Sequence, residues 1–425
     1  MFEHYNSNFK FFTRLLKILK YKEDNTYDII MKQNTLDTTL AMLCMLTPVS
    51  PGVFAKDLVI VSTTLLILRI LVTRNIFYFI KKKVLIILLF TPGIIFAIFT
   101  SSENLIRFVP VLLLVLGFPF YGFKIKAKPI MILAISILVY FIATQTLLAL
   151  GNSILLNFRE VWYPTEFDGA FNYGTVDTLF FTPEEFRAGG LYYNPNVTAS
   201  VILLYYLIFS ASFQYISENS INFSKKKPFM KNILYLIILG LVSVSLFFTS
   251  SRTAIITLIV YVASQNFNMN LLKKGLIQKK TFWAFLFTSI FLLFVGERMI
   301  DGVVSTEGSA NAKFQILTSY LADVDFLTLI LGGTFNIQFD NEYGNWIGAS
   351  GLLGIFAWIN IFKMMYHKIF QTRALIIAFL FTAVGNTLFY GLLSGSIVLI
   401  LFCITCSFWV LNHEVEKNKK SLNDN

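Results

Sequence analysis

Charged residues are scarce in this chain of 425 residues. Asp, Glu, Lys and Arg together make up 14%, whereas hydrophobic residues make up 56%, and the mean hydropathy is +0.67. A soluble domain needs a more polar surface than this composition provides. The balance therefore excludes an ordinary soluble protein and is typical of an all-α, polytopic membrane protein.

Cysteine is also rare, and three cysteines offer no disulfide framework. Cys403 and Cys406 lie in an apolar run, where helix packing explains them better than metal binding. We therefore expect neither a bound metal nor any other cofactor.

The chain shows no internal repeat, no low-complexity segment and no separate soluble domain, so residues 1–425 are interpreted as one integral membrane domain. Its basic first segment, residues 1–34, has no apolar core of the kind that a signal peptide needs. Phe12 and Leu16 share an apolar helix face there. We expect the stretch that contains them, "FKFFTRLLKILKYK", to lie along the inner membrane surface.

Long apolar stretches dominate the rest of the chain. About twelve of them are long enough, or nearly so, to cross the roughly 30 Å of hydrocarbon in a bilayer as helices. The pairs within 232–268 and 373–411 are separated only by tight turns. The expected spans cover residues 35–54, 57–73, 84–101, 104–122, 129–150, 195–216, 232–250, 252–268, 281–296, 343–364, 373–391 and 393–411.

Basic residues follow the alternation of these spans. If the N-terminus is cytoplasmic, the inner connections hold most of the 35 Lys and Arg residues, in runs such as "KIKAK" and "SKKKPFMK". This is the positive-inside rule, and it places residues 1–34 and the tail 412–425 in the cytoplasm. The net charge of +11 then belongs to the inner leaflet, and no nucleic-acid partner is expected.

Two connections are much longer than the others, residues 151–194 and 297–342, and both are expected on the outer, periplasmic side. Long loops between packed helices usually carry function. Both loops are net acidic, and the first is rich in aromatic rings, a combination that suits carbohydrate. An aromatic belt at the membrane interface explains the rings equally well, so both interpretations stay open.

The first long loop ends in "RAGGLYYNPN", residues 187 to 196. Asn194 is a good N-cap and Pro195 suits the first helical position, so a span is expected to begin here. A helix start alone does not explain Arg187 or the glycines next to it. The same arrangement recurs in "TSSRTAII", where Ser250 or Ser251 caps a span whose first turn contains Arg252.

A cation near a helix N-terminus interacts unfavourably with the helix dipole, so each of the two arginines destabilises its helix start slightly. Helix N-termini and arginines at one membrane face form an anion site, and a lipid-linked diphosphate suits it. A third helix start on the outer side is "DNEYGNWIGASGLLG", with Asp340 or Asn341 as the cap. Glycines 344, 348, 351 and 354 line one side of this span and allow close helix contact or ligand approach.

Taken in order, "RAGGLYYNPNVTA", "SSRTA" and "DNEYGNWIGASGLLG" resemble the O-antigen polymerase and ligase superfamily. Its members are polytopic, GT-C-type glycosyltransferases of the bacterial inner membrane, and with the expected spans the resemblance covers most of the chain. The resemblance implies that Arg187 and Arg252 contact undecaprenyl diphosphate. The remaining residues expected to bind substrate are Asn194, Asn196, Arg298, Lys313, Asn341 and Tyr343.

This chain departs from the family pattern at two points. Lys313 stands where relatives often have arginine, and lysine lacks the bidentate fork that holds a phosphate. Ligases of the superfamily use a histidine in the large outer loop, and Asp340 occupies the matching position here. His4, His367 and His413 all fall on the expected cytoplasmic side, which favours a polymerase over a ligase.

The resulting expectation is metal-independent polymerisation of lipid-linked oligosaccharide units at the periplasmic face. A glycan on undecaprenyl diphosphate is both donor and acceptor, the arginines stabilise the departing diphosphate, and Asp340 or Glu342 takes the acceptor proton. Membrane lipids are further partners, and a regulator of chain length is left open. The alternatives are an O-antigen ligase and a polysaccharide flippase, and the sequence does not specify the sugars, the linkage or the type of surface polysaccharide.

Overall fold

The structure of the chain is a computed structural model, and it describes helical segments separated by long stretches of sequence. The side chains at some helix ends lie outside the description. The described residues are 26–49, 57–58, 61–62, 64–65, 76–100, 125–162, 190–192, 195–219, 228–249, 251, 254–255, 257–259, 261–262, 315, 318–333, 347–357, 359–360, 401, 404–405 and 408.

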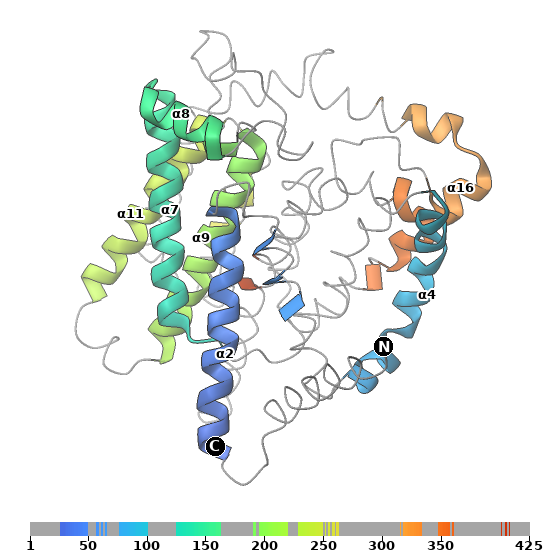
Figure 1. Cartoon of the computed structure of the whole chain (residues 1–425), viewed down its shortest axis with the longest axis horizontal. Coiled ribbons are helices and arrows are strands. Elements are labelled where there is room, and N and C mark those ends of the chain that lie inside the picture. Colours follow the sequence, from blue (N-terminus) through green and yellow to red (C-terminus); the bar gives the residue numbers. More distant parts are fainter. Residues whose placement is uncertain are drawn as a thin grey trace, which may run out of the picture.

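All regular elements within these residues are helices, and none is a strand (Figure 1). The prediction of an all-α fold is confirmed for this part of the chain. The elements are α2 (Thr26–Leu46), η1 (Thr47–Val49), α4 (Ile76–Thr100), α7 (Ala127–Ala149), α8 (Ser153–Trp162), η4 (Gly190–Tyr192), α9 (Pro195–Asn219), α11 (Pro228–Thr249) and α16 (Phe326–Leu331).

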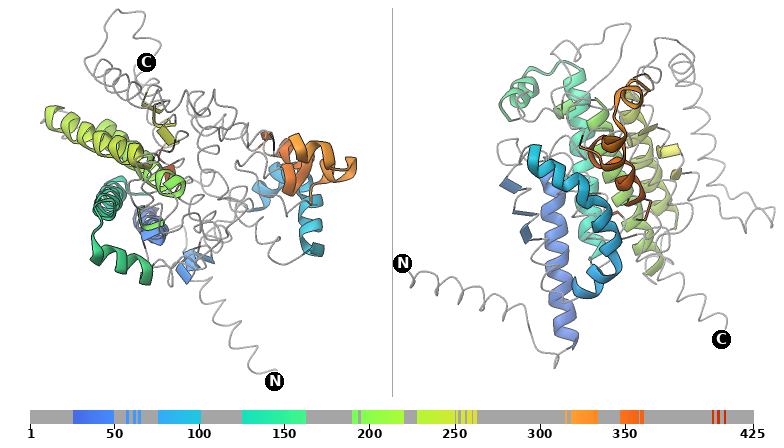
Figure 2. Two further views of the ribbon diagram at one scale, coloured as in Figure 1. Left: turned by 90° about the horizontal axis from the view of Figure 1, so that it is seen from above. Right: turned by 90° about the vertical axis from the view of Figure 1, so that its right-hand side faces the viewer.

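Helix α9 forms the centre of the largest packed group. All its side chains from Thr198 to Ser212 are buried, and a helix that is buried on every side must be surrounded by other elements. Helices α7 and α11 pack directly against it, and α2 packs against α7 (Figure 2). The rings of Phe141 on α7 and Tyr205 on α9 lie 6.1 Å apart, which is ordinary aromatic contact.

Hydroxyl groups inside these helices bond to the helices' own carbonyls. Thr144 donates to the carbonyl of Tyr140 at 2.8 Å, Ser212 to that of Ile208 at 2.7 Å, and Ser243 to that of Leu239 at 2.8 Å. A buried hydroxyl is costly unless it is hydrogen-bonded. These bonds allow serine and threonine to be buried in apolar surroundings without water.

Helices α2 and α7 run in the same direction, and α9 runs against them. The backbone N–H of Lys126, at the start of α7, donates to Thr38 Oγ1 in α2 at 2.8 Å. One to two turns further along α2, the hydroxyl of Tyr205 donates to the carbonyl of Met45. These directions are consistent with the crossing directions that the sequence predicts for the first, fifth and sixth spans.

A second packed group contains α4, α16 and the helical residues 347–357. The backbone N–H of Gly333 donates to the carbonyls of Gly348 at 3.1 Å and Ala349 at 3.3 Å. Asp325 caps α16 by accepting a hydrogen bond from the N–H of Thr328 at 2.9 Å. The hydroxyl and the N–H of Thr328 together hold the pKa of Asp325 below its usual value.

Two described helices are long and apolar enough to cross a membrane. They are Ala127–Ala149, which is all of α7, and Thr198–Ser217 within α9. Both coincide with expected spans. The structure thus supports membrane association through these two helices, and the expected number of about twelve spans remains a prediction.

Candidate functional site

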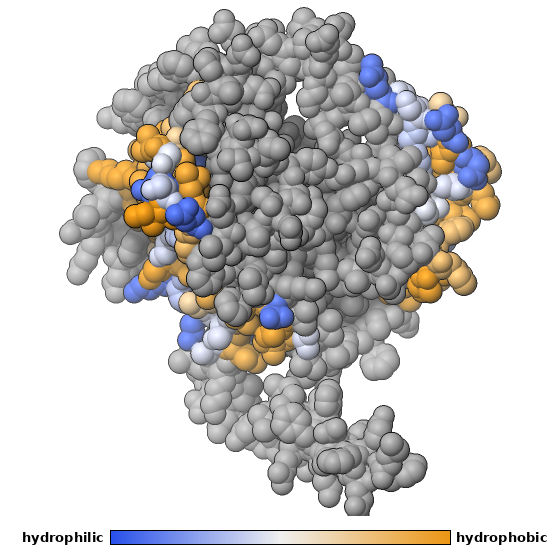
Figure 3. Space-filling model, turned by 45° about the horizontal axis from the view of Figure 1, so that its top comes forward, coloured by the Kyte–Doolittle hydropathy of each residue, from blue (hydrophilic) through white to orange (hydrophobic). Residues whose placement is uncertain are grey.

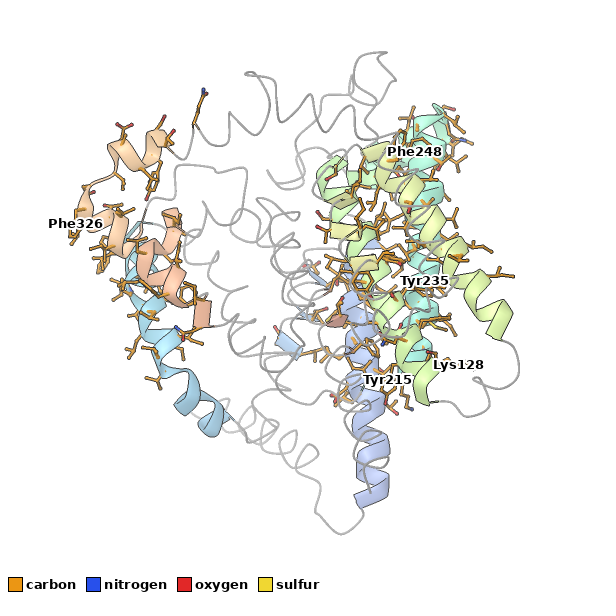
Figure 4. The ribbon with its side chains drawn as sticks, turned by 180° about the vertical axis from the view of Figure 1, so that it is seen from behind. Lys128, Tyr215, Tyr235, Phe248 and Phe326 are labelled. Atoms are coloured by element: carbon orange, nitrogen blue, oxygen red, sulfur yellow. The ribbon has the colours of Figure 1, made fainter. Side chains whose placement is uncertain are left out.

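The candidate site lies where α7 ends, α9 begins and α11 ends. These three helix ends meet at the same end of the bundle, toward the top of Figure 1. Lys128, in the first turn of α7, lies at the opposite end of the bundle from Phe248, in the last turn of α11 (Figure 4). The two motifs that contain arginine, "RAGG" and "SSR", flank these helix ends in the sequence.

The helix α9 starts at Pro195, as predicted from "NPN". Before it, the short 3-10 turn η4 packs against both α7 and α9. Gly190 has a φ of +61°, a backbone conformation that glycine adopts without the steric cost of a side chain. A side chain there would also approach α7, since its Cβ would lie 3.5 Å from the Cβ of Gln145.

Gln145 links this turn to α11. Its side chain is fully buried. Its Nε2 donates to the carbonyl of Ser245 at 3.4 Å, and its Oε1 accepts a hydrogen bond from the Ser245 hydroxyl. The Gln145 amide thus bonds to both the carbonyl and the hydroxyl of Ser245 in an apolar interior, where an unpaired polar group costs about 1–3 kcal/mol.

The chain turns back at Ser251, just beyond the end of α11. Ser251 is buried, with 4% of its surface exposed, and its N–H donates to Thr249 Oγ1 at 3.3 Å. Its carbonyl accepts from the N–H of Ile255 at 3.1 Å, which is the first hydrogen bond of the next helix. Ser251 therefore occupies the N-cap position, one of the two serines that the sequence predicted for it.

The anchors of the two motifs are therefore close together. Gly190 lies on Gln145, Gln145 bonds to Ser245, and Ser245 precedes Ser251 by less than two helical turns. In the sequence, Arg187 is three residues before Gly190 and Arg252 directly follows Ser251. Three residues of chain reach at most about 11 Å, and the two arginines themselves lie outside the described residues.

Most of the predicted site residues lie outside the described part of the chain. Asn196 is the second residue of α9, but its side chain is also outside the description. The roles of all of them therefore remain predictions. The predicted site residues outside the description are Arg187, Asn194, Arg252, Arg298, Lys313, Asp340, Asn341, Glu342 and Tyr343.

The third outward motif is described from Ile347 onward, and its glycines make the close contact that the sequence allowed. A Cβ at Gly332 would lie 2.6 Å from the carbonyl oxygen of Ala349 and from the N of Gly351. Gly332 and Gly351 have φ values of +83° and +63°. The segments 331–333 and 348–351 therefore cross backbone to backbone, a packing that only glycine permits at these positions.

Gln145 and Ser245 were not predicted from the sequence as parts of the site. Both lie in the middle of apolar runs, where a polar side chain must find a partner. A glutamine in "ATQTLLAL" was the available signal. Its partner was not visible, because the pairing depends on how α7 and α11 pack around α9.

The described residues contain no group of three or more His, Cys, Asp or Glu side chains that could hold a metal ion. Comparison with protein-family models, with curated proteins and with solved structures finds no match to this chain. The functional assignment therefore depends on the motifs and on the geometry around Gln145.

Proposed function

We propose that this protein is a polytopic glycosyltransferase of the bacterial inner membrane, with about twelve spans and both termini in the cytoplasm. Its reaction joins oligosaccharide repeat units on undecaprenyl diphosphate into O-antigen or a related surface polysaccharide. The two long loops and the outer end of the α7, α9 and α11 bundle then face the periplasm.

The observation that carries the proposal is the connection from Gly190 through Gln145 to Ser245. It ties the segments next to Arg187 and Arg252 to one end of one bundle. Two guanidinium groups near two helix N-termini suit a diphosphate, because each arginine can hold a phosphate through two parallel hydrogen bonds. A diphosphate on a lipid carrier lies at the membrane surface, where helices that cross the bilayer end.

The proposed reaction is a single displacement at the anomeric carbon of the donor. An acceptor hydroxyl oxygen forms the new glycosidic bond while the bond from the anomeric carbon to the diphosphate oxygen breaks. Undecaprenyl diphosphate leaves with the electron pair, and its growing charge is stabilised by Arg187 and Arg252. The acceptor proton passes to a carboxylate, for which Asp340 is the first candidate and Glu342 the second.

The supporting residues follow from the same motifs. Arg298 and Lys313 supply further positive charge on the outer side. Amide and phenol groups suit sugar hydroxyls, because they both donate and accept hydrogen bonds. The residues proposed to bind sugar on this basis are Asn194, Asn196, Asn341 and Tyr343.

A deletion strain separates this function from its two rivals. Loss of a polymerase leaves single units that a ligase still transfers, so in an O-antigen pathway the surface lipopolysaccharide should carry one repeat unit on its core. Bare core together with long lipid-linked polymer would instead identify a ligase. Single units trapped on the cytoplasmic face would identify a flippase. A gel of surface lipopolysaccharide, with analysis of the lipid-linked glycans, distinguishes the three outcomes.

A further inference from the structure

Helix α8 lies across the end of α7, although the sequence predicted only a loop there. The turn between them is short, because the N–H groups of Gly151 and Asn152 bond back to the carbonyls of Leu148 and Leu147 at 3.0 and 3.1 Å. Gly151 has a φ of +75°. In Figure 1 α7 stands upright with α8 lying across its upper end, and from above α7 is seen end-on while α8 runs sideways (Figure 2).

One side of α8 packs on the bundle and the other is open. Leu155, Leu156 and Phe158 pack against the apolar core, and Asn152 caps the helix by accepting from the N–H of Leu155 at 3.1 Å. Ile154, in contrast, is 77% exposed. Such a residue on a short helix is costly in water, since a large apolar side chain gains about 1.5–3 kcal/mol from full burial.

Ile154 continues an exposed apolar ridge along α7. The ridge follows helical spacing and consists of Ile132, Val139, Leu147 and Leu150, of which Leu150 is 74% exposed. Figure 3 shows apolar side chains on this side of the molecule, where α7, α8 and α11 lie. A ridge that extends over the whole length of a helix and onto the next one requires an apolar partner of the same length.

The length and the charges of the ridge identify that partner as a lipid bilayer. Lys128 is exposed at one end of the ridge, and Lys128 and Leu150 are about 33 Å apart along the helix axis. This matches the roughly 30 Å of a hydrocarbon core. Beyond Ile154 the sequence of α8 continues to Trp162, a residue type that is enriched at membrane interfaces.

We propose that α8 is an interfacial helix, anchored in the outer leaflet of the bilayer by Leu150 and Ile154. It lies along the membrane surface and fixes the depth of the bundle end to which the two arginine motifs are tied. The phosphates of a lipid carrier lie at this depth, so the anchor sets the level at which the site meets its substrate. The inference rests on the membrane placement of α7 in the proposed function.

Depth measurements on the full-length chain test the anchor. The three cysteines are replaced by alanine, and single spin labels are placed at Val139, Leu150, Ile154 and Asn157, all of which are exposed. The protein is placed in nanodiscs of phosphatidylethanolamine and phosphatidylglycerol. Label accessibility is compared between oxygen, which concentrates in lipid, and a nickel complex, which stays in water.

The proposal expects the label at Val139 deep in the bilayer, those at Leu150 and Ile154 shallow but in lipid, and that at Asn157 nearest to water. A label at Ile154 that is as open to the nickel complex as that at Asn157 would overturn the anchor. Protection of Ile154 from both reagents would also overturn it, because protein would then cover the ridge. In both cases, a Val139 label that is deep in the bilayer would still support the membrane placement of α7. A Val139 label that is exposed to water would contradict that placement as well.

Photocrosslinking to lipid provides a second test that does not require replacing the native cysteines. A photoreactive benzoylphenylalanine at Leu150, Ile154 or Asn157 is activated in the same nanodiscs, and lipid adducts are counted by mass spectrometry. We expect adducts at Leu150 and Ile154 at least fivefold more often than at Asn157. Equal yields at Ile154 and Asn157 would contradict the anchor.

Discussion

Gln145 and Ser245 show how two buried polar side chains determine the geometry of an otherwise apolar bundle. Each satisfies the other, and the turn at Gly190 packs on Gln145. A leucine at position 145 would fill a similar volume but could not hold α11 in register. At the scale of single residues, polar pairing therefore positions the site, and apolar burial supplies most of the stability.

The pairing predicts a measurable coupling. Gln145→Ala should lower the free energy of unfolding in mixed micelles by about 1–3 kcal/mol, because it leaves the buried Ser245 hydroxyl without this partner. Ser245→Ala should cost less in the Gln145→Ala background than alone, as expected for residues that interact. Ser136→Ala is the matched control, since Ser136 is an exposed serine on α7 whose hydroxyl donates to the Ile132 carbonyl of its own helix. Additive effects of the two substitutions would contradict the coupling.

The proposed diphosphate contacts predict a loss of function without a loss of protein. Arg187→Ala and Arg252→Ala should each abolish polymer while the amount of protein in the membrane stays normal. Lysine at either position should restore activity only in part, because it lacks the planar fork of arginine. Lys128→Ala removes an exposed cation at the other end of the bundle and should retain activity. A normal amount of polymer from both alanine variants would contradict the proposed anion site.

At the scale of elements, the sequence predicted where helices lie better than how they meet. Apolar periodicity and the Asn194–Pro195 signal were sufficient to place the start of α9, because caps are local features. The same reasoning predicted a loop where α8 lies, because its 10 residues are too few to cross a bilayer as a helix. The crossing of Gly332 with Gly351 was allowed by the glycine spacing, but the partner segment was not predictable, because it is distant in the sequence.

The glycine crossing predicts a graded series of alanine substitutions. Gly351→Ala should destabilise the protein by about 1–3 kcal/mol, because the new Cβ would collide with the backbone of Ile330 and Gly332. Gly240, inside α11, has no atom within 4 Å of an added Cβ. Alanine there should be neutral or stabilising by up to about 1 kcal/mol, because alanine favours helices. Thermal unfolding in detergent compares the two, and equal midpoints would refute the crossing.

At the scale of the whole molecule, α2 and α7 run in one direction and α9 in the other, and a chain that crosses a membrane about twelve times stays a prediction. The composition predicted this class of protein directly, since a chain with 14% charged residues cannot cover a soluble surface. The catalytic carboxylate is different. Whether Asp340 reaches an acceptor hydroxyl depends on how two loops far apart in the sequence approach each other, and no local pattern contains that information.

Topology gives a prediction at the same scale. Reporter fusions at residues 175 and 310 should both report a periplasmic location, and fusions at either terminus a cytoplasmic one, because the basic connections remain inside. Paired phosphatase and fluorescent reporters at each position provide internal controls. A cytoplasmic signal from residue 175 would contradict the proposal. The end of the bundle next to the two arginine motifs would then face the cytoplasm, whereas a polymerase joins its lipid-linked units in the periplasm.

The most direct test is a reaction with purified components. The full-length protein in nanodiscs is given short glycan repeat units on undecaprenyl diphosphate, with a metal chelator present and no other protein added. The account predicts a ladder of lipid-linked polymer and release of undecaprenyl diphosphate, both lost in the Arg187→Ala and Arg252→Ala variants. Unchanged single units with the wild-type protein, under conditions where it is folded, would contradict the proposal that this chain is the polymerase.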